Sequence, residues 1–279
     1  MKRYRVFAFH WDSTGDLLNR EPTEEWSEEA NELHRQDRER MIEGLTLRYG
    51  KWVIEEKLEN LQTIGGQAFS IVAYHNRFYA QAREAFIIGA YYPALTAACA
   101  LGERILNHLI LGLRDDYKGQ PGWSEFETVT SSSNWRAMIR TLENSGILLP
   151  AAAIEFRALM NARHRAIHFN PATAEKDREF ANEALKQLDK IITVQFGAFG
   201  FQPWFIPDVA GAAYIRKEWE SNPFVRLVYI PASWPVGPHH WMEYEEGKWS
   251  IHDREDYEER EITDTEYFRL QEEFTQKRN

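Results

Sequence analysis

Residues 161–169 read Asn-Ala-Arg-His-Arg-Ala-Ile-His-Phe, which places two arginines and two histidines in little more than two turns of a predicted helix. Pro150 fits the first turn of this helix, and Asn170-Pro171 is expected to end it. An arginine offers a fixed fork of donors to an anionic oxygen, and a histidine can move a proton near neutral pH. The cluster therefore suits a phosphate group.

Further helices are predicted on both sides of this one, because apolar residues recur there at helical spacing. They span residues 69–90, 93–113, from Ser132 or Ser133 to Asn144, and from Thr173 to about Phe196, with a loop over residues 119–133. Each helix has an apolar stripe to bury against its neighbours. Five such helices predict a helical bundle.

The polar side chains of the 150–169 helix gather on one face. On a wheel of about 100° per residue, one arc holds the following residues: Arg157, Asn161, His164, Arg165 and His168. No acid from this helix lies in the arc. A site for an anionic substrate and a solvated basic face are equally good interpretations of it. We expect Arg157, Asn161 and Arg165 to contact the substrate if it is a site.

Two further residues bear on this polar face, Arg163 of the same helix and Glu103 of the 93–113 helix. Arg163 falls about 140° from His168 on the wheel, so the two side chains do not converge on a single regular helix. Glu103 is the only acid between Pro93 and Leu113, on an otherwise apolar helix. Since a buried carboxylate needs a partner, we expect Glu103 to have a structural role and to pair with a base inside the bundle, Arg163 being the leading choice.

Arg163 and His168 frame the pattern R-x-x-x-x-H, with the polar His164 directly after the arginine. This arrangement resembles the signature of the HEPN superfamily. Residues 69–90 and the Ala-rich stretch from Tyr91 are similar to the first two long helices of that family, and the resemblance covers roughly residues 60–200. It implies a dimeric, metal-independent endoribonuclease of the toxin or antiviral-defence type, without a cofactor, acting on RNA and regulated by an antitoxin or another protein. It also implies that Arg163 and His168 are catalytic and that His164 supports them.

The charge distribution leaves room for such a site. The 279-residue chain has a net charge of −10, but residues 61–200 hold 13 acids and 14 bases. The acidic excess lies in residues 21–60 and 241–279, so a local basic site is possible while tight binding to arbitrary duplex nucleic acid is not expected. A single cysteine, Cys99, fits a small core residue in a reducing compartment. We expect a cytoplasmic protein without a membrane span or secretory signal.

The expected fold class is mainly α, in three parts. Residues 1–65 form an N-terminal extension with a strand over Tyr4–His10 and helices over residues 22–42 and 51–61. Residues 66–200 form the HEPN-like bundle. Residues 201–279 form a small mixed α/β unit, with a strand over residues 224–230, a hairpin around Glu246-Gly247 and a helix over residues 264–276.

Other functions and sites remain open. The bundle could be a catalytically silent HEPN-like module that binds a nucleotide or a protein. A metal-dependent hydrolase could use His239, His240, His252 and Asp253 if the hairpin brings them together. His10, Asp12 and Asp16 follow the first strand and are more typical of turns and caps. The tryptophans at positions 204, 219, 234, 241 and 249 could stack on bases, but they favour the core of the small unit.

Overall fold

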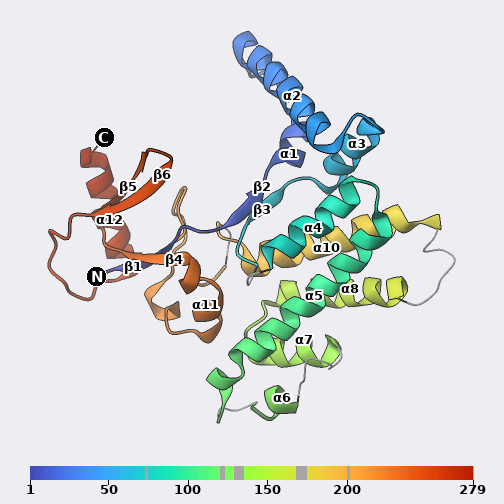
Figure 1. Cartoon of the computed structure of the whole chain (residues 1–279). Helices are drawn as coiled ribbons and strands as arrows, with labels where there is room; N and C mark the ends of the chain where they lie inside the picture. The colour runs from blue at the N-terminus through green and yellow to red at the C-terminus, as the bar shows by residue number, and fades with distance from the viewer. Residues whose placement is uncertain (73–74, 120–122, 129–134, 168–174, 200–201, 279) are drawn as a thin grey trace. The chain divides into compact units, whose positions relative to one another are not determined.

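The structure is a computed structural model that describes residues 1–72, 75–119, 123–128, 135–167, 175–199 and 202–278 (Figure 1). It is mainly α, as expected, with small antiparallel sheets. The chain divides into two compact units, residues 10–197 and residues 1–9 with 198–279.

The unit of residues 10–197 is largely helical. Its elements are β2 (His10–Asp12), α1 (Thr14–Asn19), α2 (Glu28–Tyr49), α3 (Ile54–Ile64), β3 (Gln67–Ser70), α4 (Asn76–Ile87), α5 (Tyr91–Leu113), the 3-10 turn Asp115–Tyr117, α6 (Trp123–Thr128), α7 (Trp135–Asn144), α8 (Pro150–Ile167) and α10 (Asp177–Phe196). Helix α6 lies within the segment predicted as a loop. Residues 67–70 form a strand because they pair with β2, so the helix predicted from residue 69 begins only at Asn76.

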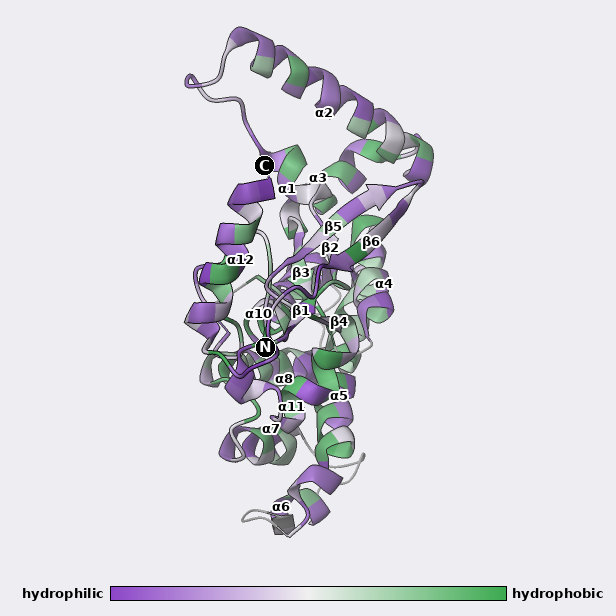
Figure 2. Cartoon of the chain, turned by 90° about the vertical axis from the view of Figure 1, so that its left-hand side faces the viewer, coloured by the Kyte–Doolittle hydropathy of each residue, from purple (hydrophilic) through white to green (hydrophobic). Residues whose placement is uncertain are grey.

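Helix α5 is the centre of this unit and packs against α4, α7, α8 and α10 (Figure 1). Its buried side chains include Cys99, and burial raises the pKa of that thiol to about 12. Cys99 is therefore a core residue, as predicted. By length and composition α5 could cross a membrane, contrary to the expectation from the sequence, but a core helix has the same features. Helix α2 extends away from the others and is mainly hydrophilic (Figure 2).

The second unit mixes short strands and helices. Its elements are β1 (Arg3–Val6), the 3-10 turn Lys217–Trp219, α11 (Pro223–Val228), the 3-10 turn Ile230–Ala232, β4 (Ser233–Val236), β5 (His240–Glu245), β6 (Lys248–Asp253) and α12 (Asp264–Arg278). The predicted hairpin and terminal helix are confirmed. Strand β1 pairs antiparallel with β4, so the first residues fold with the C-terminal part and not with residues 10–65.

The predicted strand over residues 224–230 is wrong, because residues 224–228 belong to helix α11. Asn222 caps this helix by accepting a hydrogen bond from the Val225 amide, and Pro223 occupies the first turn. Phe224, Val225 and Val228 are buried, a spacing that a helix satisfies on one face. Local capping and burial therefore outweigh the strand propensity of the segment.

Candidate functional site

Helix α8 carries the polar cluster and packs on α5, α7 and α10. Its buried residues follow helical spacing: Ala152, Ala153, Phe156, Leu159 and Ala162. The opposite face is exposed and contains Arg157, Asn161, His164 and Arg165, which confirms the predicted polar face over the described residues. His168 lies outside the described residues, and its role stays a prediction.

Arg163 lies away from the exposed face and forms the predicted ion pair with Glu103 of α5. Its Nη2 is 3.1 Å from Glu103 Oε2, and its guanidinium lies over the Trp135 ring at 5.9 Å from the ring centroid. The pair is only partly buried, since the Arg163 and Glu103 side chains are 37% and 28% exposed. The expected burial of Glu103 is therefore corrected, while its pairing is confirmed.

The exposed arginines of α8 meet acids from neighbouring helices. Arg157 pairs with Glu143 of α7, and Arg165 Nη2 lies 2.9 Å from Glu183 Oε2 of α10. The exposed face of α8 carries no acidic residue of its own. Packing against α7 and α10 brings two acidic residues to it, Glu143 and Glu183. Neither arginine can bind a substrate phosphate without competing with its carboxylate.

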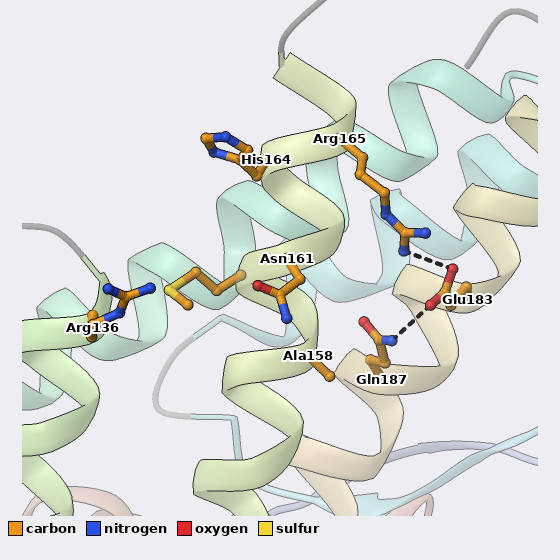
Figure 3. A pocket seen from close by; sticks show the side chains of 8 residues that line it. Arg136, Ala158, Asn161, His164, Arg165, Glu183 and Gln187 are labelled. Atoms are coloured by element: carbon orange, nitrogen blue, oxygen red, sulfur yellow. Dashed lines mark hydrogen bonds and ion pairs between the residues drawn. The ribbon is translucent and has the colours of Figure 1, made fainter. Parts of the chain in front are cut away.

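A groove of about 650 Å³ lies alongside this face, between α7, α8 and α10 (Figure 3). Its lining comprises Arg136, Ala158, Met160, Asn161, His164, Arg165, Glu183 and Gln187. The predicted residues Asn161, His164 and Arg165 thus come together in one groove. Arg157 and Arg163 do not line it.

Sequence reasoning missed Arg136 and Gln187. Arg136 is in the first turn of α7 and forms no ion pair with any described residue. Gln187 Nε2 donates to Glu183 Oε1 at 3.3 Å, while the buried Gln187 Oε1 lacks a partner in the described part of the chain. No local pattern marks either residue, since both reach the groove only through helix packing.

The residues proposed for a metal site have other partners. In the second unit, buried His240 donates from Nδ1 to the Gly237 carbonyl at 2.7 Å, so its Nε2 accepts from Arg5 at 2.8 Å and from Tyr214 at 3.1 Å. Burial lowers the pKa of His240 to about 4. Both ring nitrogens are thus engaged, and the ring is held neutral.

The other members of that set are also engaged. His239 contacts Asp256, His252 Nε2 is 3.6 Å from Glu243, and Asp253 Oδ2 accepts from Gly237 N at 2.7 Å. In the described ranges, no group of three or more His, Cys, Asp or Glu side chains is placed to hold a metal ion. The set therefore does not form the metal site considered from the sequence.

The residues after the first predicted strand act in turns, the more typical of their two interpretations. Asp12 Oδ1 accepts from Thr14 N at 2.9 Å, Asp16 Oδ1 accepts from Gly66 N at 2.7 Å, and His10 Nδ1 contacts Gln67 Nε2 at 3.0 Å. Each bond fixes local backbone or the β2–β3 pair.

The tryptophans of the second unit divide between core and surface. Trp204 is 2% exposed and packs against Phe224 and Tyr229, as predicted for a core residue. Trp234 and Trp249 are more than 60% exposed, which differs from that prediction.

Comparison with protein-family models, with curated proteins and with solved structures found no match to this chain.

Proposed function

We propose that the unit of residues 10–197 is a metal-independent endoribonuclease that acts as a dimer. The observation that supports this best is the placement of Arg163. Glu103 and the Trp135 ring hold its guanidinium near the end of α8, five positions before His168 in the sequence and beside the exposed His164. A cation fixed in this way is suited to charge that develops on a phosphoryl group.

The chemistry follows from the residue types. One His168 takes the proton of a ribose 2′-OH while the 2′ oxygen attacks phosphorus. The bond to the 5′ oxygen breaks, and the same His168, now protonated, donates that proton to the leaving oxygen. Arg163 stabilises the pentavalent intermediate, and His164 supports the pair. The products are a 2′,3′-cyclic phosphate and a 5′-OH, and DNA is not cleaved because it lacks the 2′-OH.

The ion pairs of Arg157 and Arg165 favour a second candidate, a catalytically silent module that binds a nucleotide or a protein. In this case the carboxylates of Glu143 and Glu183 regulate access to the two arginines. The module would bind RNA or a partner without cleaving it, so cleavage itself separates the two candidates.

The test uses the purified full chain and end-labelled RNA in the presence of EDTA. We expect cleavage with cyclic-phosphate ends, and we expect His168→Ala to slow it by roughly 10²–10⁴-fold, the usual contribution of a positioned acid–base group. His252→Ala, on a partly exposed histidine of the other unit, is the matched control and should leave the rate unchanged. Absence of cleavage by the wild type would favour the silent module, and activity that needs a divalent ion would contradict the proposal.

A further inference from the structure

The cations beside the groove differ in whether an acid already neutralises them. Arg165 is paired with Glu183, and Arg163, outside the groove, is paired with Glu103. Arg136 is exposed and forms neither an ion pair nor a hydrogen bond with a described residue. Its five N–H donors are therefore available to an anion entering the groove.

Two of the polar groups that line the groove with Arg136 are carboxamides, beside His164 and the Arg165–Glu183 ion pair. Figure 3 shows Asn161 on α8 facing Gln187 on α10, with Arg136 on α7 at the other side. Asn161 is exposed and makes no hydrogen bond within the described ranges, and Gln187 Oε1 is buried without a partner there. A carboxamide presents a donor and an acceptor side by side, which matches the edge of a nucleobase. Ala158 and Met160 add apolar surface against which a base can lie.

We propose that this groove binds one nucleotide of single-stranded RNA, with Arg136 on its phosphate and the Asn161 carboxamide on the edge of its base. The inference rests on the proposed function and adds a nucleotide subsite to it. The groove is open to solvent, and its volume of about 650 Å³ lies in the range of small-ligand pockets. A base can enter only when it is unstacked, so the substrate is a single strand.

The groove shares helix α8 with Arg163, the arginine proposed to be catalytic. His164 lines the groove and directly follows Arg163 in the sequence. The bound nucleotide therefore neighbours the phosphate that is cleaved. An acidic peptide fits less well. Its carboxylates could bind Arg136, but they would be repelled by Glu183. The Asn161 and Gln187 carboxamides would also have no nucleobase edge to hydrogen-bond.

Binding is measured in the cleavage-deficient His168→Ala protein, by fluorescence anisotropy with short RNA strands that differ at one nucleotide. Arg136→Ala should weaken binding roughly tenfold, as expected for loss of a charge-assisted hydrogen bond, and should reduce the salt slope by about 0.7. Arg140→Ala is the control, because Arg140 is an exposed arginine on the same helix that does not line the groove. Asn161→Ala should reduce the differences in affinity among these RNA strands.

The outcomes separate this inference from the proposed function. Equal loss in Arg136→Ala and Arg140→Ala would show nonspecific attraction and overturn the subsite, as would equal affinity for duplex RNA or tighter binding of an acidic peptide. Cleavage that depends on His168 would still support the nuclease. Conversely, selective loss in Arg136→Ala without any cleavage by the wild type would retain the subsite within a silent module.

Discussion

At the residue scale, we expect the ion pair between Glu103 and Arg163 to orient the arginine while contributing little to stability. Its atoms are 3.1 Å apart, but both side chains retain about a third of their exposure to water. Solvent screens such a pair, and exposed pairs contribute about 0.2–1 kcal/mol. The sequence favoured a buried Glu103, for which loss of the partner would cost more.

We predict that Glu103→Ala lowers the free energy of unfolding by no more than about 1 kcal/mol and slows RNA cleavage more strongly, because Arg163 loses its orientation. Denaturant unfolding and single-turnover cleavage provide the two readouts. Glu103→Gln is the matched variant, since its amide can keep one hydrogen bond and should recover part of the rate. A large loss of stability with unchanged chemistry in the surviving folded protein would contradict a positioning role.

At the scale of elements, Gly102 permits α5 to approach α7 and α8 closely. A Cβ atom at this position would lie 2.6 Å from Leu159 Cδ2 and 2.7 Å from the Trp135 ring. Leu159 and Trp135 are both buried, so neither can move without disturbing the core. The same contact brings Trp135 under Arg163, and the packing of three helices thus shapes the site.

We predict that Gly102→Ala destabilises the helical unit by about 1–3 kcal/mol through overpacking. Gly44→Ala is the control, because Gly44 is exposed in α2 and its added Cβ would meet nothing within 4 Å. That change should stabilise the helix by up to about 1 kcal/mol, the difference in helix propensity. Denaturation midpoints of the two variants should move in opposite directions, and a shift of the same sign in both would refute the close-packing explanation.

At the scale of the whole molecule, the proposed nuclease needs two copies of α8. Arg163 is held on the α5 side by Glu103, whereas the exposed face of α8 carries Asn161 and His164. The sequence alone leads us to expect His168 about 140° from Arg163 on a regular helix, and we therefore expect a second protomer to complete the pair.

We predict a homodimer at micromolar concentration by light scattering. Arg163→Ala and His168→Ala should each cleave RNA far more slowly than the wild type, and mixing the two proteins should restore part of the rate, because one composite site of the mixed dimer receives both intact residues. A monomer in solution would refute the prediction, and so would a dimer whose mixed variants stay as slow as each variant alone.

Local pattern was sufficient for much of the architecture. Helical periodicity located α5, α7, α8 and α10, and Glu246-Gly247 marked the hairpin turn. Local pattern failed where a segment pairs with a distant strand, and where capping and burial outweigh the strand propensity of a segment. Residues 67–70 became a strand by pairing with β2, and residues 223–228 became a helix through an Asn222 cap and burial.

The sequence also determined the chemical character of α8, because the order of residues on a helix fixes which of them share a face. It predicted the exposed Arg157, Asn161, His164 and Arg165, and the pairing of Glu103 with Arg163. Only the tertiary structure decided which charges are neutralised and which residues line the groove. Glu143, Glu183, Arg136 and Gln187 belong to other helices, and the packing that brings them to α8 depends on side-chain shape across the whole core, which no local spacing records.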